Sequence, residues 1–360
     1  MHKVDHNYPT LETKGLIFYI TSYNTVLQDG PAGIFISDDL LKSNTVLRKV
    51  DSNGVKLWFA VFNPAMNATE EAPVHAILKL IKQDLPNKSK RGMAASIQIY
   101  AELVEEAERE QALLEQAIEI KVDTPEVKEI AHRILLQAYN ATVDFVNILR
   151  RRYNQYWLLP PNPNLDAGWS YVVYYSRPRK EWYSLIADEN FHLPVEPSIA
   201  QRREWPGNII IRAIDEDDME GLHVDRPEKP FSFAEEIVAN ALVDLGNARV
   251  RSAILHTIIG LESSAKRGLQ YLLKNRLAGI EQGAVLEAIS REISVVTLAR
   301  VVHAHILGDE SIDWPKINNL YGLRNTIVHR GQKRLPPKDI IKDQILEVFK
   351  YITMLEEKIQ

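Results

Sequence analysis

The chain has 360 residues, of which 45% are hydrophobic and 25% charged, and its formal net charge is −5. This length leaves room for two domains, and the composition is typical of a globular protein rather than a long disordered chain. Because the sequence contains no cysteine, it excludes disulfides, thiolate nucleophiles and cysteine-ligated metals. Any chemistry must therefore come from histidine, carboxylate, hydroxyl, lysine or arginine side chains.

The first elements are short runs of aromatic and β-branched residues. Residues 15–20, 33–37 and 56–62 have this composition and are separated by turn residues such as "DGPAG", which predicts strands. A heavily charged helical pattern follows from about residue 90 to residue 121. A second helix is expected from residue 124 to about residue 154, since Thr124 is a good N-cap and Pro125 suits the first helical position. Two antiparallel helices joined by a short turn are the simplest arrangement.

The next segment is again strand-like, with candidate strands at 169–175, 181–186 and 208–214. Nine of the 29 aromatic residues fall between Tyr153 and Tyr183, several of them interleaved with arginine or lysine. This composition is typical of a half-buried antiparallel sheet with a basic outer face, and equally of a surface that binds single-stranded RNA. The sequence leaves both interpretations open.

A polar segment with two prolines, residues 223–231, marks the expected domain boundary. We therefore expect an α+β domain at residues 1–228, built from antiparallel strands and a long helical hairpin, with a sensing, regulatory or RNA-binding role. Residues 229–360 are expected to form an all-α bundle. From Phe231 onward there are 17 Lys and Arg against 15 Asp and Glu, whereas residues 1–230 hold 26 against 33. The mildly basic second part permits a polyanionic ligand.

The expected bundle has clear helix boundaries. Ser232 and Glu235 form a capping box that begins a pair of helices bent near Gly246. Further helices are predicted at about 283–307, from the N-cap Asp313 to Gly331, and from the "PPKD" sequence to the C-terminus. The last of these has apolar positions on one face at Ile341, Ile345, Val348, Phe349, Ile352 and Leu355.

The helix that ends at Gly331 carries an unusual set of polar residues, Arg324, Asn325 and His329, in the sequence "LRNTIVHRG". At about 100° per residue, Arg324 lies at the edge of the apolar stripe, and Asn325 and His329 face the same way, one turn apart. Three such side chains can line a shallow groove beside the core. The residues expected to form the core stripe are Ile317, Leu320, Leu323, Ile327 and Val328.

The sequence "RNTIVH" resembles the Arg-x4–6-His motif of the HEPN superfamily, including the polar residue after the arginine, and it lies in a helical bundle of suitable length over about residues 231–360. The resemblance implies a HEPN-like bundle that acts as a homodimeric endoribonuclease without a metal or other cofactor. In such proteins the motif helices of two copies face each other and form one composite site. It also implies a setting in bacterial antiviral defence or a toxin-type stress response.

The resemblance assigns roles that suit the residue types. His329 would transfer protons, Arg324 would hold the phosphate, Asn325 would orient either partner, and Arg330 and Lys333 would bind the RNA substrate. Toxins of two-gene HEPN–nucleotidyltransferase systems carry a modifiable tyrosine where this chain has Gly331. Control of the activity through such a tyrosine is therefore not expected. We expect the N-terminal domain or a regulatory partner protein to control it instead.

Other interpretations of the same residues stay open at this point. Arg324 can pair with a carboxylate and His329 can interact with the helix dipole, with no catalysis, so that the bundle is a dimerisation or RNA-binding module. Glu262 is expected to pair with Lys266 at the i,i+4 spacing. His303 and His305 point to opposite sides of a helix, so no metal site is expected there. The acidic segment 215–225 departs from the calcium-loop pattern and is interpreted as a solvated loop.

Targeting signals are not evident. Residues 1–16 lack the apolar core of a signal peptide, and no apolar run approaches the ~20 residues that a bilayer requires. The expected location is the cytoplasm, without membrane contact.

Overall fold

The computed structural model divides the chain into two compact units, the first comprising the described residues up to Pro230 and the second those from Phe231 onward. The residues that the structure describes are 2–4, 15–24, 26–27, 30–31, 34–35, 46–52, 55–60, 93–94, 96–103, 107–156, 158, 160–161, 171–186, 222, 229–276, 283, 287–289, 292–330 and 334–359.

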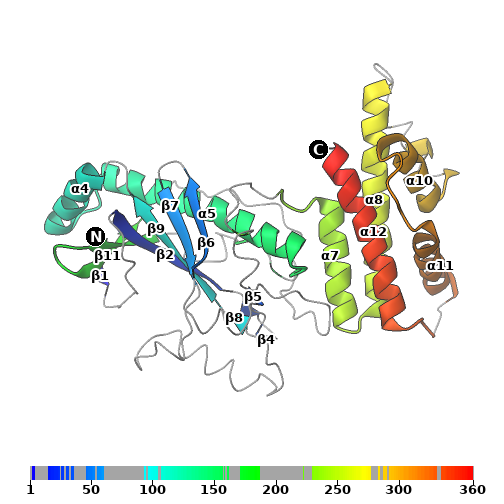
Figure 1. Ribbon diagram of the computed structural model, residues 1–360, viewed down its shortest axis with the longest axis horizontal. Coiled ribbons are helices and arrows are strands. Elements are labelled where there is room, and N and C mark those ends of the chain that lie inside the picture. Colours follow the sequence, from blue (N-terminus) through cyan, green and yellow to red (C-terminus); the bar gives the residue numbers. More distant parts are fainter. Residues whose placement is uncertain are drawn as a thin grey trace. The chain divides into compact units, whose positions relative to one another are not determined.

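The described part of the first unit consists mainly of strands and two long helices (Figure 1). The helices are α4 (Ala107–Ile120) and α5 (Pro125–Arg152). The strands are β1 (His2–Val4), β2 (Leu16–Asn24), β3 (Val26–Leu27), β4 (Gly30–Pro31), β5 (Ile34–Phe35), β6 (Val46–Ser52), β7 (Val55–Ala60), β8 (Met93–Ala94), β9 (Ser96–Leu103), β10 (Tyr171–Ser176) and β11 (Glu181–Ile186).

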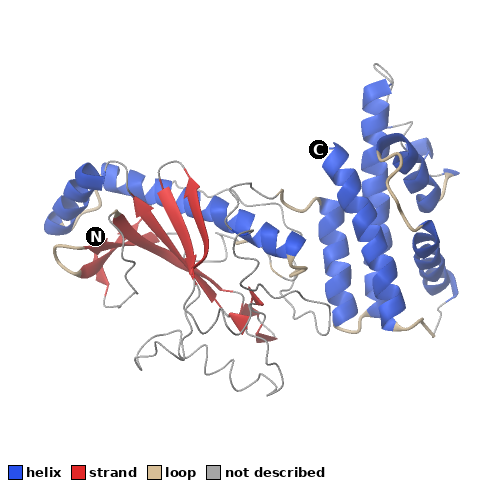
Figure 2. Ribbon diagram, viewed as in Figure 1, coloured by secondary structure: helices blue, strands red, loops and turns tan. Residues whose placement is uncertain are grey.

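Seven strands form one sheet in the order β1-β11-β10-β2-β9-β7-β6, and every neighbouring pair is antiparallel (Figure 2). The hairpin of β10 and β11 inserts between β1 and β2, so strands distant in sequence lie side by side. At the centre, Phe18 of β2 pairs with Ala101 of β9. The predicted strands at 15–20, 56–62, 169–175 and 181–186 correspond to four members of this sheet, whereas the candidate at 208–214 lies outside the described residues.

Both faces of the sheet are buried. On one face, the Phe59 ring of β7 lies 5.0 Å from the Phe145 ring of α5. The helix α5 also contacts β9, β10 and β11. Successive side chains of a strand alternate between faces, and the other face carries a buried cluster of Tyr19, Tyr100, Val173 and Trp182. Among the aromatic residues of β10 and β11, Trp182 is buried in this cluster and Tyr174 is buried on the opposite face, which favours the sheet-face interpretation over an exposed surface for RNA.

The helix predicted at 90–121 is wrong over its first half. Residues Ser96–Leu103 form β9, and the helix α4 begins only at Ala107. Ile99 and Tyr100, which point to opposite faces, are both fully buried in the sheet. A strand that is buried on both faces lacks the alternation of polar and apolar residues that identifies a strand in a sequence. The charged helical pattern of α4 follows closely after this strand, so the predicted helix began too early in the sequence.

The two helices of this unit are linked by Lys121–Thr124. Thr124 caps α5, since its side chain accepts a hydrogen bond from the Val127 N–H, and Pro125 is the first helical residue as expected. Arg133 of α5 donates to Glu110 of α4 across the helix pair at 2.6 Å. The α4 helix is also tied to the sheet, because Glu115 accepts hydrogen bonds from Ser176 (2.6 Å) at the end of β10 and from Arg179 (3.1 Å) in the following turn.

The second unit is helical in its described part (Figure 1). The long helix α8 contacts each of the helices α7, α10, α11 and α12, whose bounds are given below. Helix α7 packs closely against it, since a Cβ atom added at Gly260 would lie 2.6 Å from Val238 Cγ2 and 3.0 Å from the Ala234 carbonyl oxygen. The helices are α7 (Phe233–Gly246), α8 (Val250–Arg276), α10 (Val295–Ile306), α11 (Trp314–Arg330) and α12 (Lys338–Ile359).

The helix boundaries of this unit follow local signals. The capping box of Ser232 and Glu235 is present. The helical pattern is interrupted after Gly246, where α7 ends and α8 follows, as predicted. The helix predicted at 283–307 is helical at the residues described in its first part, but it is not continuous, because a new helix begins at Val295 with Ser294 as its N-cap. The Ser294 hydroxyl accepts a hydrogen bond from the Thr297 N–H at 3.2 Å and so competes with a continuous helix.

Candidate functional site

The candidate site lies on α11, whose first turn is fixed by polar and aromatic contacts. The Lys316 N–H donates to Asp313 Oδ1 at 3.2 Å, which confirms Asp313 as a capping residue. The Trp314 ring stacks edge-on against His303 at 5.4 Å and lies 5.9 Å from the Tyr351 ring of α12. These contacts hold the N-terminal end of α11 on the bundle.

The apolar stripe of α11 is buried only in its first half. Ile317 and Leu320 are fully buried, Leu323 and Ile327 are partly exposed, and the Val328 side chain is 50% exposed. The prediction that all five residues form the core is therefore wrong for Val328, and Leu323 and Ile327 are buried only in part. The stripe continues beyond the point at which α8 and α12 cover it within one copy of the chain.

The polar residues of the motif lie on this less covered half. Arg324 and Asn325 are partly buried, and Arg324 Nη1 donates to Asn325 Oδ1 at 3.0 Å. His329 and Arg330 are exposed in the last turn, where the negative end of the helix dipole favours positive charge. Arg324 thus has an oriented guanidinium group with further N–H donors available to a phosphate. The predicted substrate-binding Lys333, like Gly331, lies outside the described residues.

Arg324 and His329 do not converge within one helix. They are five positions apart, which corresponds to about 140° of rotation and about 7.5 Å along the axis. Asn325 and His329 are four residues apart and share a face. A phosphate held by Arg324 of one copy is therefore not directly in front of His329 of the same helix.

A second polar cluster, which the sequence did not suggest, lies where α7 meets α8. Arg249 Nε donates to Asp244 Oδ1 at 2.7 Å, and His256 Nδ1 lies 2.9 Å from Asp244 Oδ2. Burial raises the pKa of the Asp244 carboxyl, but hydrogen bonds from His256, Arg249 and Ser252 outweigh it and hold this pKa below its usual value. A histidine about two helical turns after an arginine is too common a pattern to single out in a sequence.

This cluster lies at the same end of the bundle as the motif. Lys338, the first residue of α12, donates to the Gly246 carbonyl oxygen at 3.0 Å and so joins the start of α12 to the end of α7. Since α11 ends at Arg330 and α12 begins at Lys338, the motif lies beside this junction, at the lower end of the bundle in Figure 1. Arg330 at the end of α11, Lys338 at the start of α12 and Arg249 just before α8 therefore lie at the same end of the bundle.

The remaining polar side chains of interest make mainly local contacts. Lys266 pairs with Glu262 at 2.6 Å, as predicted from the i,i+4 spacing. The His303 ring bonds the Glu310 carbonyl oxygen at 2.8 Å, and His305 is exposed. Across the described residues no group of three or more His, Cys, Asp or Glu is placed to hold a metal ion. The acidic segment 215–225 falls outside the described residues, except for Leu222.

Comparisons with known proteins give no match: neither a family model, nor a curated protein, nor a solved structure is significantly similar to this chain. Among the helices of the described part, none combines the length and apolar character needed to cross a membrane.

Proposed function

We propose that the helical unit is a metal-independent endoribonuclease of the HEPN type, and that its site forms where α11 helices of two copies meet. The observation that supports this proposal best is the second half of α11. There Arg324, Asn325 and His329 lie beside Ile327 and Val328, apolar residues that one copy leaves partly exposed. The resemblance of "RNTIVH" to the superfamily motif extends the proposal to bacterial antiviral defence or a toxin-type stress response.

The proposed reaction needs only these side chains and the RNA itself. His329 of one copy removes the proton from a ribose 2′-OH, and the resulting oxygen attacks the adjacent phosphorus. The bond from phosphorus to the 5′ oxygen breaks, and that oxygen receives a proton from the second copy's histidine. Arg324 stabilises the charge that develops on the phosphoryl oxygens. The products are a 2′,3′-cyclic phosphate and a 5′-OH, and DNA is not a substrate because it lacks the attacking hydroxyl.

The two-copy arrangement follows from the geometry of one helix. Arg324 and His329 diverge by about 140°, so a single copy does not place both against one phosphate. A twofold axis beside α11 would bring the arginine of one copy and the histidine of the other to a common cleft, and it would cover Val328. The cluster of Asp244, Arg249 and His256 lies near this end and would extend the positive surface along the RNA backbone.

The test is cleavage of a total RNA pool by the purified full chain, with and without EDTA. We expect cleavage in both conditions, with cyclic-phosphate ends. His329→Ala and Arg324→Ala should each slow it by at least ~10²-fold, the usual scale for a lost proton-transfer or charge-stabilising group. His305→Ala removes an exposed histidine of α10 and serves as the matched control, with the parental rate expected.

Three outcomes would contradict the proposal. Activity that EDTA abolishes would assign the chemistry to a metal. Cleavage by His329→Ala at the parental rate would remove the histidine from the reaction. RNA that binds but is never cut would leave the alternative function, a non-catalytic dimerisation or RNA-binding module.

A further inference from the structure

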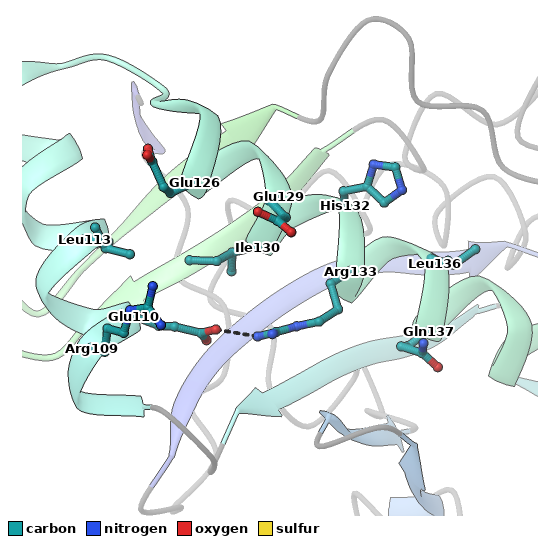
Figure 3. Close-up of a pocket in the computed structure, with 10 residues that line it drawn as sticks. All are labelled: Arg109, Glu110, Leu113, Glu126, Glu129, Ile130, His132, Arg133, Leu136 and Gln137. Atoms are coloured by element: carbon teal, nitrogen blue, oxygen red, sulfur yellow. Dashed lines mark hydrogen bonds and ion pairs between the residues drawn. The ribbon is translucent and has the colours of Figure 1, made fainter.

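A cavity of about 580 Å³ lies between α4 and α5 in the first unit (Figure 3). Its volume is within the usual range for small-molecule sites, roughly 300–1,000 Å³. Both helices contribute side chains to it, and its wall contains charged as well as apolar groups. The lining residues on α4 are Arg109, Glu110 and Leu113, and those on α5 are Glu126, Glu129, Ile130, His132, Arg133, Leu136 and Gln137.

The floor of this cavity is an ion pair with unused hydrogen-bonding capacity. The Glu110 residue is only 5% exposed, and Arg133 Nη2 donates to its Oε1 at 2.6 Å (Figure 3). Among the described residues, Glu110 Oε2 and Arg133 Nε are both buried and have no hydrogen-bond partner. Buried polar atoms are nearly always satisfied, because an unsatisfied one has lost its water without compensation. One acceptor and one donor are therefore left over on the two partners of an ion pair that lines the cavity.

The charges around the cavity restrict the ligand. Two arginines and three glutamates line it, so its formal charge is −1 when His132 is neutral. A phosphorylated ligand would add negative charge beside three carboxylates and is disfavoured. A purely cationic ligand would satisfy Glu110 but leave the Arg133 N–H without an acceptor. A ligand with both charges close together satisfies both atoms.

The apolar part of the wall adds a second requirement. Leu113, Ile130 and Leu136 line the same cavity and offer no hydrogen bonds. A ligand that places a hydrocarbon group against these three side chains gains from removal of its apolar surface from water. The ligand must therefore combine a compact zwitterionic head with an apolar body.

We propose that this cavity binds a free α-amino acid with an apolar side chain. Its ammonium group donates to Glu110, and its carboxylate accepts from Arg133. Because both unsatisfied atoms are buried, the ligand reaches them by separating the ion pair of Glu110 and Arg133. A zwitterion replaces each half of the pair with an equivalent charge, so no buried charge is left uncompensated.

The walls of the site are held in place before the ligand arrives. Two turns after the start of α4, Glu115 is bonded to Ser176 and Arg179 at the end of the sheet. The buried side of α5 packs on the same sheet, as the contact of Phe145 with Phe59 shows. A site whose walls are already ordered loses less conformational entropy on binding. Binding at this site does not depend on the proposed ribonuclease activity.

The test is calorimetric titration of the full chain with leucine and with analogues that each lack one feature. Leucine should bind. Leucinamide, which lacks the carboxylate, and 4-methylpentanoate, which lacks the ammonium group, should each bind at least tenfold more weakly. Glycine, which has the same head without the hydrocarbon, should also bind at least tenfold more weakly. Adenosine and putrescine represent a neutral nucleoside and a diamine, and neither should bind.

Two variants locate the site. Glu110→Gln should weaken leucine binding at least tenfold, and Glu108→Gln, an exposed position on the same helix outside the cavity lining, should leave it unchanged. If Glu110→Gln fails to fold, the analogue series on the parental chain still decides the question. The proposal is overturned by the absence of binding at millimolar leucine, by equal binding of leucinamide, by preference for adenosine or putrescine, or by undiminished binding in folded Glu110→Gln.

Discussion

The ion pair between Arg267 of α8 and Glu356 of α12 offers a quantitative test of how the helical unit is held together. Arg267 Nη1 donates to Glu356 Oε2 at 2.6 Å, and Ser264 Oγ lies 3.5 Å from the other carboxylate oxygen. The Glu356 side chain is only 2% exposed, whereas that of Arg267 is 41% exposed. Replacement of Arg267 by methionine keeps most of the apolar stem and leaves a buried carboxylate without its cation.

The expected loss lies between two limits. Removal of one partner from a fully buried pair costs about 3–5 kcal/mol, and an exposed pair contributes about 0–1 kcal/mol. Because solvent reaches the arginine and only Glu356 is deeply buried, we expect Arg267→Met to lower the free energy of unfolding by about 2 kcal/mol. With a urea dependence of about 2 kcal/mol per molar, the midpoint for the helical unit should fall by about 1 M.

The assay is urea unfolding followed by circular dichroism, with Lys266→Met as the control. Lys266 is the neighbouring residue and pairs with Glu262, but both of those side chains are 40% exposed, so its loss should cost about 0.5 kcal/mol or less. The double variant Arg267→Met/Glu356→Gln should recover part of the lost stability, because the orphaned charge is gone. Equal destabilisation by Arg267→Met and Lys266→Met would refute the reasoning.

Two further predictions concern the candidate site and its surroundings. Val328→Asp should convert a dimer into a monomer in light-scattering measurements at micromolar concentration. The control Phe233→Asp, at a 56% exposed apolar residue on α7, should not. A parental chain that is already a strict monomer would contradict the two-copy site. Asp244→Asn should lower the free energy of unfolding at pH 7 by about 1–2 kcal/mol. Because the pKa of Asp244 is lower in the folded chain than in the unfolded chain, its stabilisation is present above the unfolded value, near 3.9, and is lost as the pH falls through the folded value. The deficit of Asp244→Asn in urea unfolding should therefore shrink at pH 3, with exposed Asp343→Asn as control, and an equal deficit at both pH values would exclude this assignment.

The features that could be predicted from the sequence are those set by neighbouring residues. Thr124 with Pro125, and Ser232 with Glu235, specify helix starts through bonds within three residues, and the structure contains both. The strand Ser96–Leu103 depends instead on pairing with β2 and β7, which are distant in sequence, so local pattern gave the wrong element. The burial of a residue also depends on contacts with residues distant in sequence, so a local pattern does not determine it.

The site shows the same division between local and distant information. The helical spacing of Arg324, Asn325 and His329 followed from residue order alone. The exposure of Val328 did not, since it depends on how far α8 and α12 extend along α11. The ion pair of Glu110 with Arg133 joins residues 23 positions apart on different helices, and no sequence pattern identified it.

The two borders of the seven-stranded sheet have a consequence for association between copies. At one border, β1 has only three residues, and its Lys3 bonds Glu181 of β11 at 2.7 Å. At the other border, β6 carries Arg48, Lys49 and Asp51 within seven residues. Short border strands and charged side chains discourage the pairing of one sheet with another. Loss of β1 would uncover the backbone of β11, whose exposed Ile186 carries no charge, and open that border to strand exchange and fibrillar aggregation.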